Sequence, residues 1–491
     1  MTARAPGERI PGERSPGERT LDERAPGGPA EPRFPLVARA LPLAGGALLT
    51  ALLIAWDRRP FRAFDTYFHL RFGDEFRHGW SIGHPGQPSP ASTNDWAPTQ
   101  WLPQVGLSWI ADVGGRTGLV IVFAVLSTGL TAALYLLLRR HAGPGVSLLL
   151  AAIVLIGLLP SLSLRPQVLS YAFLIALLAA WDSARRTGRV PWLLVPLGWL
   201  WATCHGMWII GVAASALLAV LVVLERRPDR RRAVVLLLVP LGMLAAALVT
   251  PVGPRLLTAV VQVNSRGRYF AEWGVPEILT LGSAPLAVLL AAAVLLLVRR
   301  TGVAPYDIGL LALGGAFSVY SGRTVPLALI TLAVVVAAQW GRRRERPPTG
   351  MREYAVVALL AGAALAAAPF QTVVEDPADD VRPFAAALAA LPDGSRVVTD
   401  WPTGGVLLWT EPQLDVPLHG YGDVYTDDEL ERYAGLARLE PGWDQTLARL
   451  APRAALLPED ERLSYALRRD GWQVLQRSGD LVLLVPPADE A

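Results

Sequence analysis

The sequence GMWIIGVAASALLAVLVVLERRPDRRR, residues 206–232, contains the pattern that decides the fold of this chain. Residues 206–224 are apolar almost throughout, and five arginines follow within the next eight residues. An apolar run of ~17–25 residues matches the ~30 Å hydrocarbon core of a bilayer. Short connections rich in arginine stay in the cytoplasm. We therefore predict a transmembrane helix whose arginine-rich end is cytoplasmic.

The same pattern recurs along most of the chain. The predicted spans are residues 40–56, 118–138, 144–160, 166–181, 190–203, 206–224, 233–250, 281–298, 303–320, 324–340 and 354–370. Arginine clusters follow every even-numbered span, as in Arg139-Arg140 and Arg299-Arg300. This alternation predicts a multi-pass protein of the cell (plasma) membrane with about eleven helices, a cytoplasmic N-terminus and an extracytoplasmic C-terminal region.

The composition supports a polytopic membrane protein and excludes several other classes. The chain has 491 residues, of which 52% are hydrophobic, and its mean hydropathy is +0.36. The net charge of +3 gives no indication of nucleic-acid binding. The single Cys204 excludes an intramolecular disulfide. No phosphate-binding glycine-rich loop occurs, so the sequence predicts no ATP site.

Composition also divides the chain into three parts. Residues 1–33 repeat the motif Pro-Gly-Glu-Arg and carry almost no apolar residues, so we expect a disordered cytoplasmic tail. Residues 34–370 form the predicted membrane domain, with a first outer loop at 57–104. Residues 371–491 are predicted to be a small extracytoplasmic α/β domain. Its expected strands are 396–399, 454–457, 472–475 and 481–485, and its expected helices are 427–438 and 461–469.

The first outer loop contains the best candidate for a catalytic group. Phenylalanines recur every fourth residue from Phe64 to Phe76, which predicts an amphipathic helix lying along the membrane surface. Asp65 and His69 are four residues apart and share one flank of that helix. A carboxylate beside a histidine can act as a general base toward a sugar or lipid hydroxyl. The alternative is an ordinary pair on a solvated helix face.

Polar residues in the other outer connections extend this site. Arginine binds phosphate through a planar, permanently charged fork, so Arg165 and Arg323 are candidates for a lipid phosphate. The alternative is that they reach toward ordinary phospholipid headgroups. The predicted substrate-binding residues are His69, Asp95, Arg165, Gln167, His205, Glu272 and Arg323. No cofactor is required and no zinc-type spacing occurs, while a divalent cation on Asp65, Asp74 or Asp95 is left open.

Several short motifs resemble those of the C-type (GT-C) membrane glycosyltransferase superfamily, in a little-characterised bacterial branch. The resemblance rests on FDTYFHL at 64–70 followed by Gly73, and on Arg165-Pro166-Gln167. Further similar stretches are Ser92-Thr93, Trp101-Leu102, WATCHG at 201–206, TPVG at 250–253, Glu272-Trp273, Arg323 and WPTGGVLLW at 401–409. Together they cover most of residues 34–485.

The resemblance implies a membrane enzyme that uses a polyprenyl-phosphate sugar as donor. By this likeness Asp65 is the base or part of a metal site, Arg165 and Arg323 are candidates for binding the donor phosphate, and His205 and Glu272 are candidates for lining the cavity. We expect transfer of a hexosyl or pentosyl group to an unknown cell-envelope acceptor at the outer face. Two alternatives are a non-catalytic scaffold with this fold and a transporter of a lipid-linked glycan. The predicted spans lack the ionisable residues that transport pathways usually carry.

Overall fold

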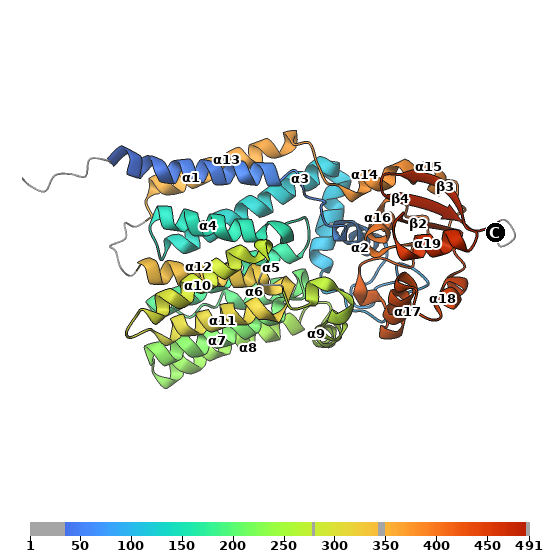
Figure 1. The fold of residues 1–491 in the computed structure, drawn as a ribbon. Helices are drawn as coiled ribbons and strands as arrows, with labels where there is room; N and C mark the ends of the chain where they lie inside the picture. Colours follow the sequence, from blue (N-terminus) through green and yellow to red (C-terminus); the bar gives the residue numbers. More distant parts are fainter. Residues whose placement is uncertain (1–34, 277–279, 342–348, 488–491) are drawn as a thin grey trace, which may run out of the picture.

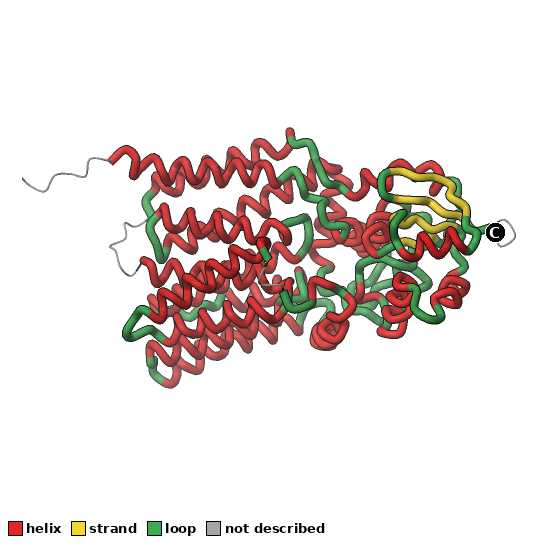
Figure 2. The backbone as a smooth tube through the Cα atoms, viewed as in Figure 1, coloured by secondary structure: helices red, strands yellow, loops and turns green. Residues whose placement is uncertain are grey.

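A computed structural model describes residues 35–276, 280–341 and 349–487, so the tail predicted at 1–33 lies outside the described residues. Figure 1 shows a bundle of long helices at one end of the molecule and a small α/β domain at the other. Figure 2 shows that the strands lie within the α/β domain. The elements between these two parts position the candidate site.

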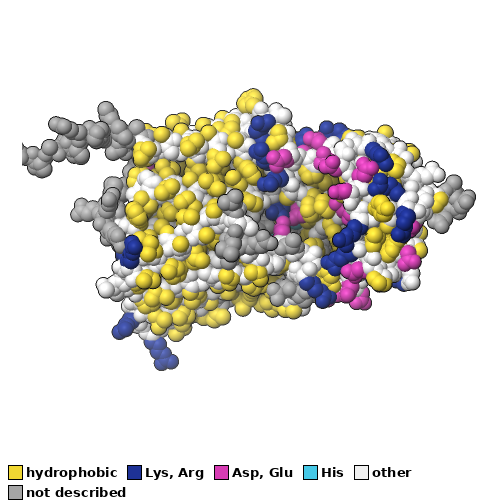
Figure 3. Space-filling model, in the orientation of Figure 1, with side chains coloured by type: hydrophobic (Ala, Val, Ile, Leu, Met, Phe, Trp, Pro, Cys, Tyr) yellow, Lys and Arg dark blue, Asp and Glu magenta, His cyan; other side chains and the backbone are white. Residues whose placement is uncertain are grey.

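The bundle is built from helices that correspond to the predicted spans. They are α1 (Pro35–Trp56), α3 (Trp101–Arg139), α4 (Pro144–Leu158), α5 (Gln167–Thr187), α6 (Leu194–Cys204), α7 (Trp208–Arg226), α8 (Arg230–Leu248), α10 (Ala284–Val298), α11 (Pro305–Tyr320), α12 (Val325–Gly341) and α13 (Met351–Ala367). Within the described residues, seven helical stretches are long and apolar enough to cross a membrane. Apolar side chains cover the visible face of the bundle in Figure 3, and charged side chains gather where the bundle meets the α/β domain.

Helix α3 is longer than the span predicted at 118–138, because it has two arms. The arms meet at Gly115, which has φ 57° and ψ −153°. A positive φ is readily adopted only by glycine, so this residue permits the sharp turn. Residues 101–114 cross the end of the bundle, and the second arm runs along it (Figure 1). The side chain of Gln104 in the first arm contacts the ring of His69 (3.0 Å).

Helix α2 (Asp65–His78) forms as predicted, but its phenylalanine stripe does not lie at a membrane surface. Phe68 is 3% exposed and Phe72 is fully buried. Both rings pack against Tyr421 of the α/β domain, with centroid distances of 5.2 and 4.9 Å. The expectation that this stripe faces the membrane surface was therefore wrong, because the α/β domain covers it. Periodicity identifies an apolar face, but it cannot distinguish lipid from a distant part of the same chain as the partner of that face.

The long connection between α8 and α10 contains structure that the sequence reading did not predict. It forms α9 (Arg255–Ser265), followed by the short 3-10 turns η2 (Arg266–Tyr269) and η3 (Ala271–Trp273). Another 3-10 turn, η5 (Gly322–Thr324), lies between α11 and α12. The amide of Gly322 donates to the carbonyl of Gly274 (3.0 Å), so η3 and η5 are held side by side.

The α/β domain contains a four-stranded sheet in the order β1-β2-β4-β3. Its strands are β1 (Val397–Thr399), β2 (Ala454–Pro458), β3 (Gln473–Ser478) and β4 (Leu481–Val485), which confirms the four predicted strands. The β1–β2 pair is parallel and the other two pairs are antiparallel. The helices are α14 (Pro377–Val381), α15 (Ala385–Ala389), α16 (Trp401–Thr410), α17 (Asp427–Arg438), α18 (Trp443–Leu450) and α19 (Arg462–Arg469).

Glycines allow the α/β domain to approach its neighbours closely. A Cβ atom on Gly404 in α16 would lie 1.7 Å from the carbonyl oxygen of Leu418. A Cβ atom on Gly420 would lie 2.4 Å from the ring of Phe64, which directly precedes α2. The segment 418–423 is therefore pressed between α16 and α2, and it forms one wall of the site.

Candidate active site

A cavity of about 660 Å³ lies between the end of the helix bundle and the α/β domain. Its walls come from the start of α2, the connections before α5 and α7, the segment from α9 to η3, η5, and the turn at 420–423. These elements are far apart in the sequence. The cavity therefore exists only when the bundle and the α/β domain are both folded.

Asp65 enters the cavity as the first residue of α2, and neighbouring contacts hold it there. The hydroxyl of Thr66 donates to the carbonyl of Leu164 (3.0 Å), and the amide of Leu164 donates to the carbonyl of Pro60 (2.9 Å). These two bonds join the start of α2 to the connection between α4 and α5. As a result, Arg165 Nη1 donates to Asp65 Oδ2 at 2.9 Å.

A chain of four charged side chains crosses the cavity from Asp65. Arg165 also contacts Glu272 Oε1 (3.2 Å), and Glu272 Oε2 accepts from Arg323 Nε (3.1 Å). The guanidinium of Arg323 lies over the ring of Trp273, 4.5 Å from its centroid. Asp65 and Glu272 carry two negative charges and the two arginines carry two positive charges, so the group is balanced.

For Arg165 and Glu272, the ion pairs outweigh the free-energy cost of removing the two charges from water. Burial by itself would lower the pKa of Arg165, but the nearby carboxylates of Asp65 and Glu272 raise it above its ordinary value. Burial would likewise raise the pKa of Glu272, but Arg165 and Arg323 lower it. Both side chains are therefore charged at neutral pH.

Two buried histidines in the cavity are neutral. Burial, together with the charges of Arg323 and Arg165, lowers the pKa of His205 to about 3. Burial and the same arginines also lower the pKa of His69. The Met207 amide donates to Nδ1 of His205 (3.4 Å), and the Gln104 amide donates to Nδ1 of His69 (3.0 Å). Ser170 Oγ also lies 2.9 Å from Nδ1 of His205, and a ring that accepts at Nδ1 carries its proton on Nε2, where it can donate a hydrogen bond.

The structure brings together seven of the eight residues predicted for the site. The residues that line the cavity are Asp65, His69, Arg165, Gln167, His205, Glu272 and Arg323. Gln167 is nearly buried at the start of α5, where its side-chain amide donates to the hydroxyl of Tyr171 (2.8 Å). These residues come from five separate segments of the chain. Their convergence supports a common role.

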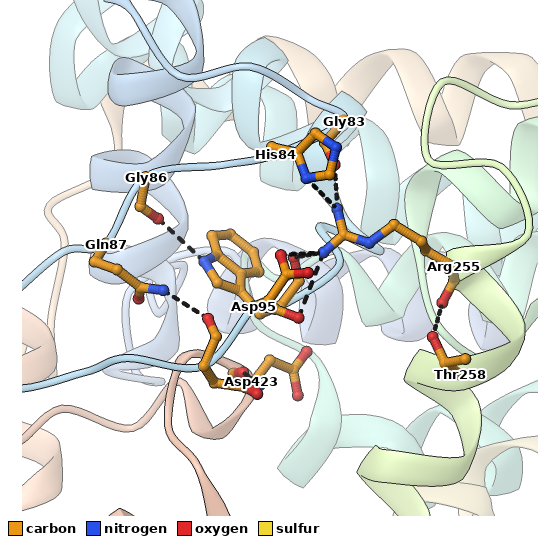
Figure 4. A network of polar contacts seen from close by, with 10 residues as sticks. Gly83, His84, Gly86, Gln87, Asp95, Arg255, Thr258 and Asp423 are labelled. Carbon is orange, nitrogen blue, oxygen red and sulfur yellow. Dashed lines mark hydrogen bonds and ion pairs between the residues drawn. The ribbon is translucent and has the colours of Figure 1, made fainter.

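Asp95, the eighth predicted residue, does not line the cavity. Figure 4 shows its carboxylate directed toward the guanidinium of Arg255, at the start of α9. Arg255 also donates to the carbonyl of Trp96 (3.1 Å). Asp95 thus helps to join the first outer loop to α9, and its side chain is 77% exposed. The structure gives it a place in the scaffold of the site and no contact with the cavity.

The sequence reading missed the contribution of the α/β domain and of η2 to the cavity. Tyr421 and Asp423 line it from the turn after Leu418, and Arg266 lines it from η2. Burial raises the pKa of Asp423, although Arg266 and Arg323 oppose this. Only the tertiary structure brings the turn Gly420-Tyr421-Gly422-Asp423 to the same cavity as Asp65.

Asp65, Asp74 and Asp95, the positions left open for a divalent cation, do not come together in the structure. Asp65 pairs with Arg165, Asp74 pairs with His78 and Asp95 pairs with Arg255. The three carboxylates therefore face different partners. Over the described ranges, no group of three or more histidine, cysteine, aspartate or glutamate side chains could hold a metal ion.

No family model matches the sequence, and a search of curated proteins gives no match. Solved structures do resemble the fold. The oligosaccharyltransferase of Archaeoglobus fulgidus aligns with a TM-score of 0.50 and 12% identity, over 87% of this chain and 70% of that protein. The mycobacterial arabinofuranosyltransferase AftD aligns with a TM-score of 0.51 and 15% identity, over 91% of this chain and 40% of that protein.

A third structure, ArnT from Cupriavidus metallidurans bound to undecaprenyl phosphate, has a TM-score of 0.49 and 14% identity, over 93% of this chain and 99% of that protein. At these levels of identity, the likeness concerns the fold. All three structures are GT-C glycosyltransferases. The predicted resemblance is confirmed at this level: the chain has the GT-C fold of integral-membrane glycosyltransferases.

Proposed function

We propose that this protein is a membrane glycosyltransferase that moves a sugar from a polyprenyl-phosphate donor to a cell-envelope acceptor. The observation that carries this proposal is the position of Asp65 beside two arginines in one cavity. A base for the acceptor and two groups for a phosphate are the minimum that such a transfer needs. The GT-C fold supports the same class of reaction.

In this mechanism Asp65 accepts the proton of the acceptor hydroxyl. The hydroxyl oxygen forms a bond to the anomeric carbon of the sugar, and the bond from that carbon to the phosphate oxygen breaks. The electron pair of the broken bond stays on the polyprenyl phosphate, which gains one negative charge. Arg165 and Arg323 stabilise this developing charge electrostatically, and such stabilisation is usually a large part of catalysis. The neutral His69 and His205 can donate hydrogen bonds to the sugar.

The apolar wall of the cavity supports a lipid-linked donor. Ile209 and Ile210 at the start of α7, Val261 in α9 and Tyr320 at the end of α11 line it. Val261 is 70% exposed and Tyr320 is 57% exposed. A prenyl chain that lies along these residues can leave its phosphate at the arginines while its tail remains in the bilayer.

We also propose that the cavity opens on the extracytoplasmic side and that the eleven bundle helices are the membrane spans. The arginine-rich connections support this orientation, since those that can be placed, such as 185–189 and 226–232, lie at the end of the bundle away from the cavity. The shortest helix, α6, has 11 residues and covers about 16 Å, so it would reach only part of the way across the bilayer.

A non-catalytic scaffold with the same fold is the second candidate. A scaffold has no need to gather Asp65, Arg165, His205 and Arg323 around one cavity, because charged and polar side chains are costly to remove from water. Their convergence therefore favours the enzyme over the scaffold.

The test compares cells that lack the gene after complementation with the wild type, with Asp65→Asn or with Asp74→Asn. Asp74 is the matched control, because it lies on the same helix and pairs with His78 outside the cavity. Mass spectrometry then measures envelope glycans and lipid-linked sugars. We expect Asp65→Asn cells to lose one glycan and to accumulate its polyprenyl-linked precursor, while Asp74→Asn cells match the wild type. Full restoration by Asp65→Asn at normal expression would remove Asp65 from the mechanism.

A further inference from the structure

Glu272 holds a position that a phosphate group would also hold. Its two carboxylate oxygens contact different arginines, Oε1 with Arg165 Nη1 (3.2 Å) and Oε2 with Arg323 Nε (3.1 Å). Arginine recognises carboxylate and phosphate with the same planar fork. A phosphate that bound both arginines would therefore place two of its oxygens close to where the carboxylate oxygens of Glu272 now lie.

Of these three side chains, Glu272 is the one that can move most easily. Arg165 is 8% exposed and is also bonded to Asp65 and to the hydroxyl of Ser163 (3.0 Å). The Glu272 side chain is 49% exposed. Within the described part of the chain, its side-chain contacts are those with Arg165 and Arg323.

The backbone around Glu272 does not need to move when its side chain leaves. The amide of Gly322 donates to the carbonyl of Gly274, which ties the Glu272 segment to the turn that carries Arg323. A Cβ atom on Gly322 would lie 3.0 Å from the Glu272 carbonyl oxygen, so the two segments are already in close contact. Rotation of the Glu272 side chain toward solvent is enough to release both arginines from Glu272, while Arg165 keeps its contact with Asp65.

We propose that Glu272 is a resident anion that occupies the phosphate position in the empty cavity and exchanges with a singly charged phosphodiester of the donor. This inference rests on the proposed function, and it adds the charge class of the donor and a role for Glu272. In this role Glu272 is a specificity-determining residue, since it competes with the ligand.

The charge of the site favours a donor with one phosphate over a diphosphate-linked donor. When Glu272 has turned away, Asp65 is the one carboxylate among the described residues that still forms an ion pair with either arginine, so Asp65, Arg165 and Arg323 together carry a net charge of +1. A phosphodiester carries −1 and restores the balance, whereas a diphosphate diester carries −2 and exceeds it. Arg266 does not alter this count, because its Nε is paired with Asp427 (2.7 Å).

The same exchange assists release of the product. After transfer, the polyprenyl phosphate is a monoester with a charge of about −1.5 to −2 at neutral pH. Once Asp65 has passed the acceptor proton to solvent, the product exceeds the +1 charge of Asp65, Arg165 and Arg323, and the carboxylate of Glu272 is close enough to return to the arginines. Glu272 therefore weakens the binding of the product more than the binding of the donor.

The experiment measures binding of three short prenyl probes to the purified full-length protein in detergent by titration calorimetry. The probes are farnesyl methyl phosphate (one charge), farnesyl phosphate and farnesyl diphosphate. The variants are Glu272→Gln and, as the matched control, Glu375→Gln. Glu375 also bridges two arginines, Arg59 and Arg62, but it lies outside the cavity.

We expect Glu272→Gln to bind farnesyl methyl phosphate about tenfold more tightly than the wild type, because it removes a competing charge. The gain should be larger still for farnesyl phosphate and farnesyl diphosphate, while Glu375→Gln leaves all three affinities unchanged. Unchanged or weaker binding in Glu272→Gln would show that Glu272 only orients the arginines, and it would overturn the proposal. An equal gain for all three probes would overturn the charge preference.

Two safeguards keep the test decisive. Glu272→Ala is a second variant that removes the same charge, and thermal unfolding checks that both variants are folded. Failure of the proposed function is seen separately, because the glycan experiment with Asp65→Asn needs no binding measurement. If Asp65→Asn restores the glycan while Glu272→Gln still tightens binding, the transfer reaction fails and the anion exchange remains. If instead Asp65→Asn abolishes the glycan and Glu272→Gln does not tighten binding, the proposed function remains and only the role of Glu272 is removed.

Discussion

Asp65 and Arg165 form an ion pair at 2.9 Å although 100 residues separate them in the sequence. Asp65 is the first residue of α2, and Arg165 lies in the connection between α4 and α5. Their side chains are 15% and 8% exposed, so little water screens the pair. The contact joins the candidate base to the candidate phosphate-binding group, and it determines how each responds to mutation.

Replacement of Arg165 should destabilise the protein more than replacement of Asp65. Arg165→Gln leaves the carboxylates of Asp65 and Glu272 without their common partner, and breaking a buried pair in this way costs about 3–5 kcal/mol. The double variant Asp65→Asn/Arg165→Gln should recover part of that loss. Thermal unfolding in detergent measures the stability of each variant, and glycan analysis should show no activity in either. A double variant no more stable than Arg165→Gln would contradict the coupling.

Replacement of Arg323 should reduce transfer without a large loss of stability. Arg323→Gln removes one of the two phosphate-binding groups, and loss of one such group lowers turnover roughly 100-fold in comparable sites. The matched control is Arg268→Gln. Arg268 also lies over an aromatic ring, that of Tyr269 at 4.8 Å, but it does not line the cavity. The amount of mature glycan in complemented cells checks the prediction, and equal amounts for both variants would count against a role for Arg323.

Gly73 should be required for the contact between α2 and α3. A Cβ atom there would lie 2.0 Å from the carbonyl oxygen of Gln104, which is backbone and cannot move aside. Gly73→Ala should therefore lower stability by roughly 1–3 kcal/mol, although alanine favours helices by itself. The same variant should disturb His69, because Gln104 also donates to its ring.

The control for this prediction is Gly79→Ala at the end of α2. No atom lies within 4 Å of the position that its Cβ would take, and its φ of 167° is extended backbone. Thermal unfolding should show a lower midpoint for Gly73→Ala and little change for Gly79→Ala. Equal midpoints would mean that α2 can shift away from α3 without cost.

Buried histidines should make the protein less stable in acid. Burial lowers the pKa of His419 to about 3, and its Nε2 has no hydrogen-bond partner among the described residues. The unfolded chain therefore binds the proton first as the pH falls. The stability is complete above about pH 6.5 and declines toward pH 3, by up to about 1.4 kcal/mol per pH unit for each such histidine.

The measurement for this prediction is the free energy of unfolding as a function of pH. His419→Leu should flatten the decline below pH 6.5, and His205 should account for part of the slope that remains. The control substitution is His84→Leu, because the His84 ring lies exposed at the surface, where Arg255 contacts its Nδ1 (3.4 Å). A slope that His419→Leu does not change would show that His419 is not held neutral by the fold.

Local patterns were enough to predict most elements of the chain. A run such as 206–224 predicts a helix by its length and composition alone, and the structure contains it as α7. The strand at 481–485 and the helix at 427–438 were also predicted from short-range periodicity, and the structure contains them as β4 and α17. Seven of the eight predicted site residues meet in one cavity, because polar groups at the ends of apolar helices converge at the same end of the bundle.

The sequence by itself determined the helical bundle, the small sheet, and the presence of Asp65 and the arginines at one end of the molecule. Only the tertiary structure decided that the α/β domain covers α2, that Tyr421 and Asp423 close the cavity, and that Asp95 pairs with Arg255 outside it. Helices and strands follow from neighbours within a few residues. The wall of the cavity depends on contacts between segments hundreds of residues apart, and local patterns carry no information about those distances.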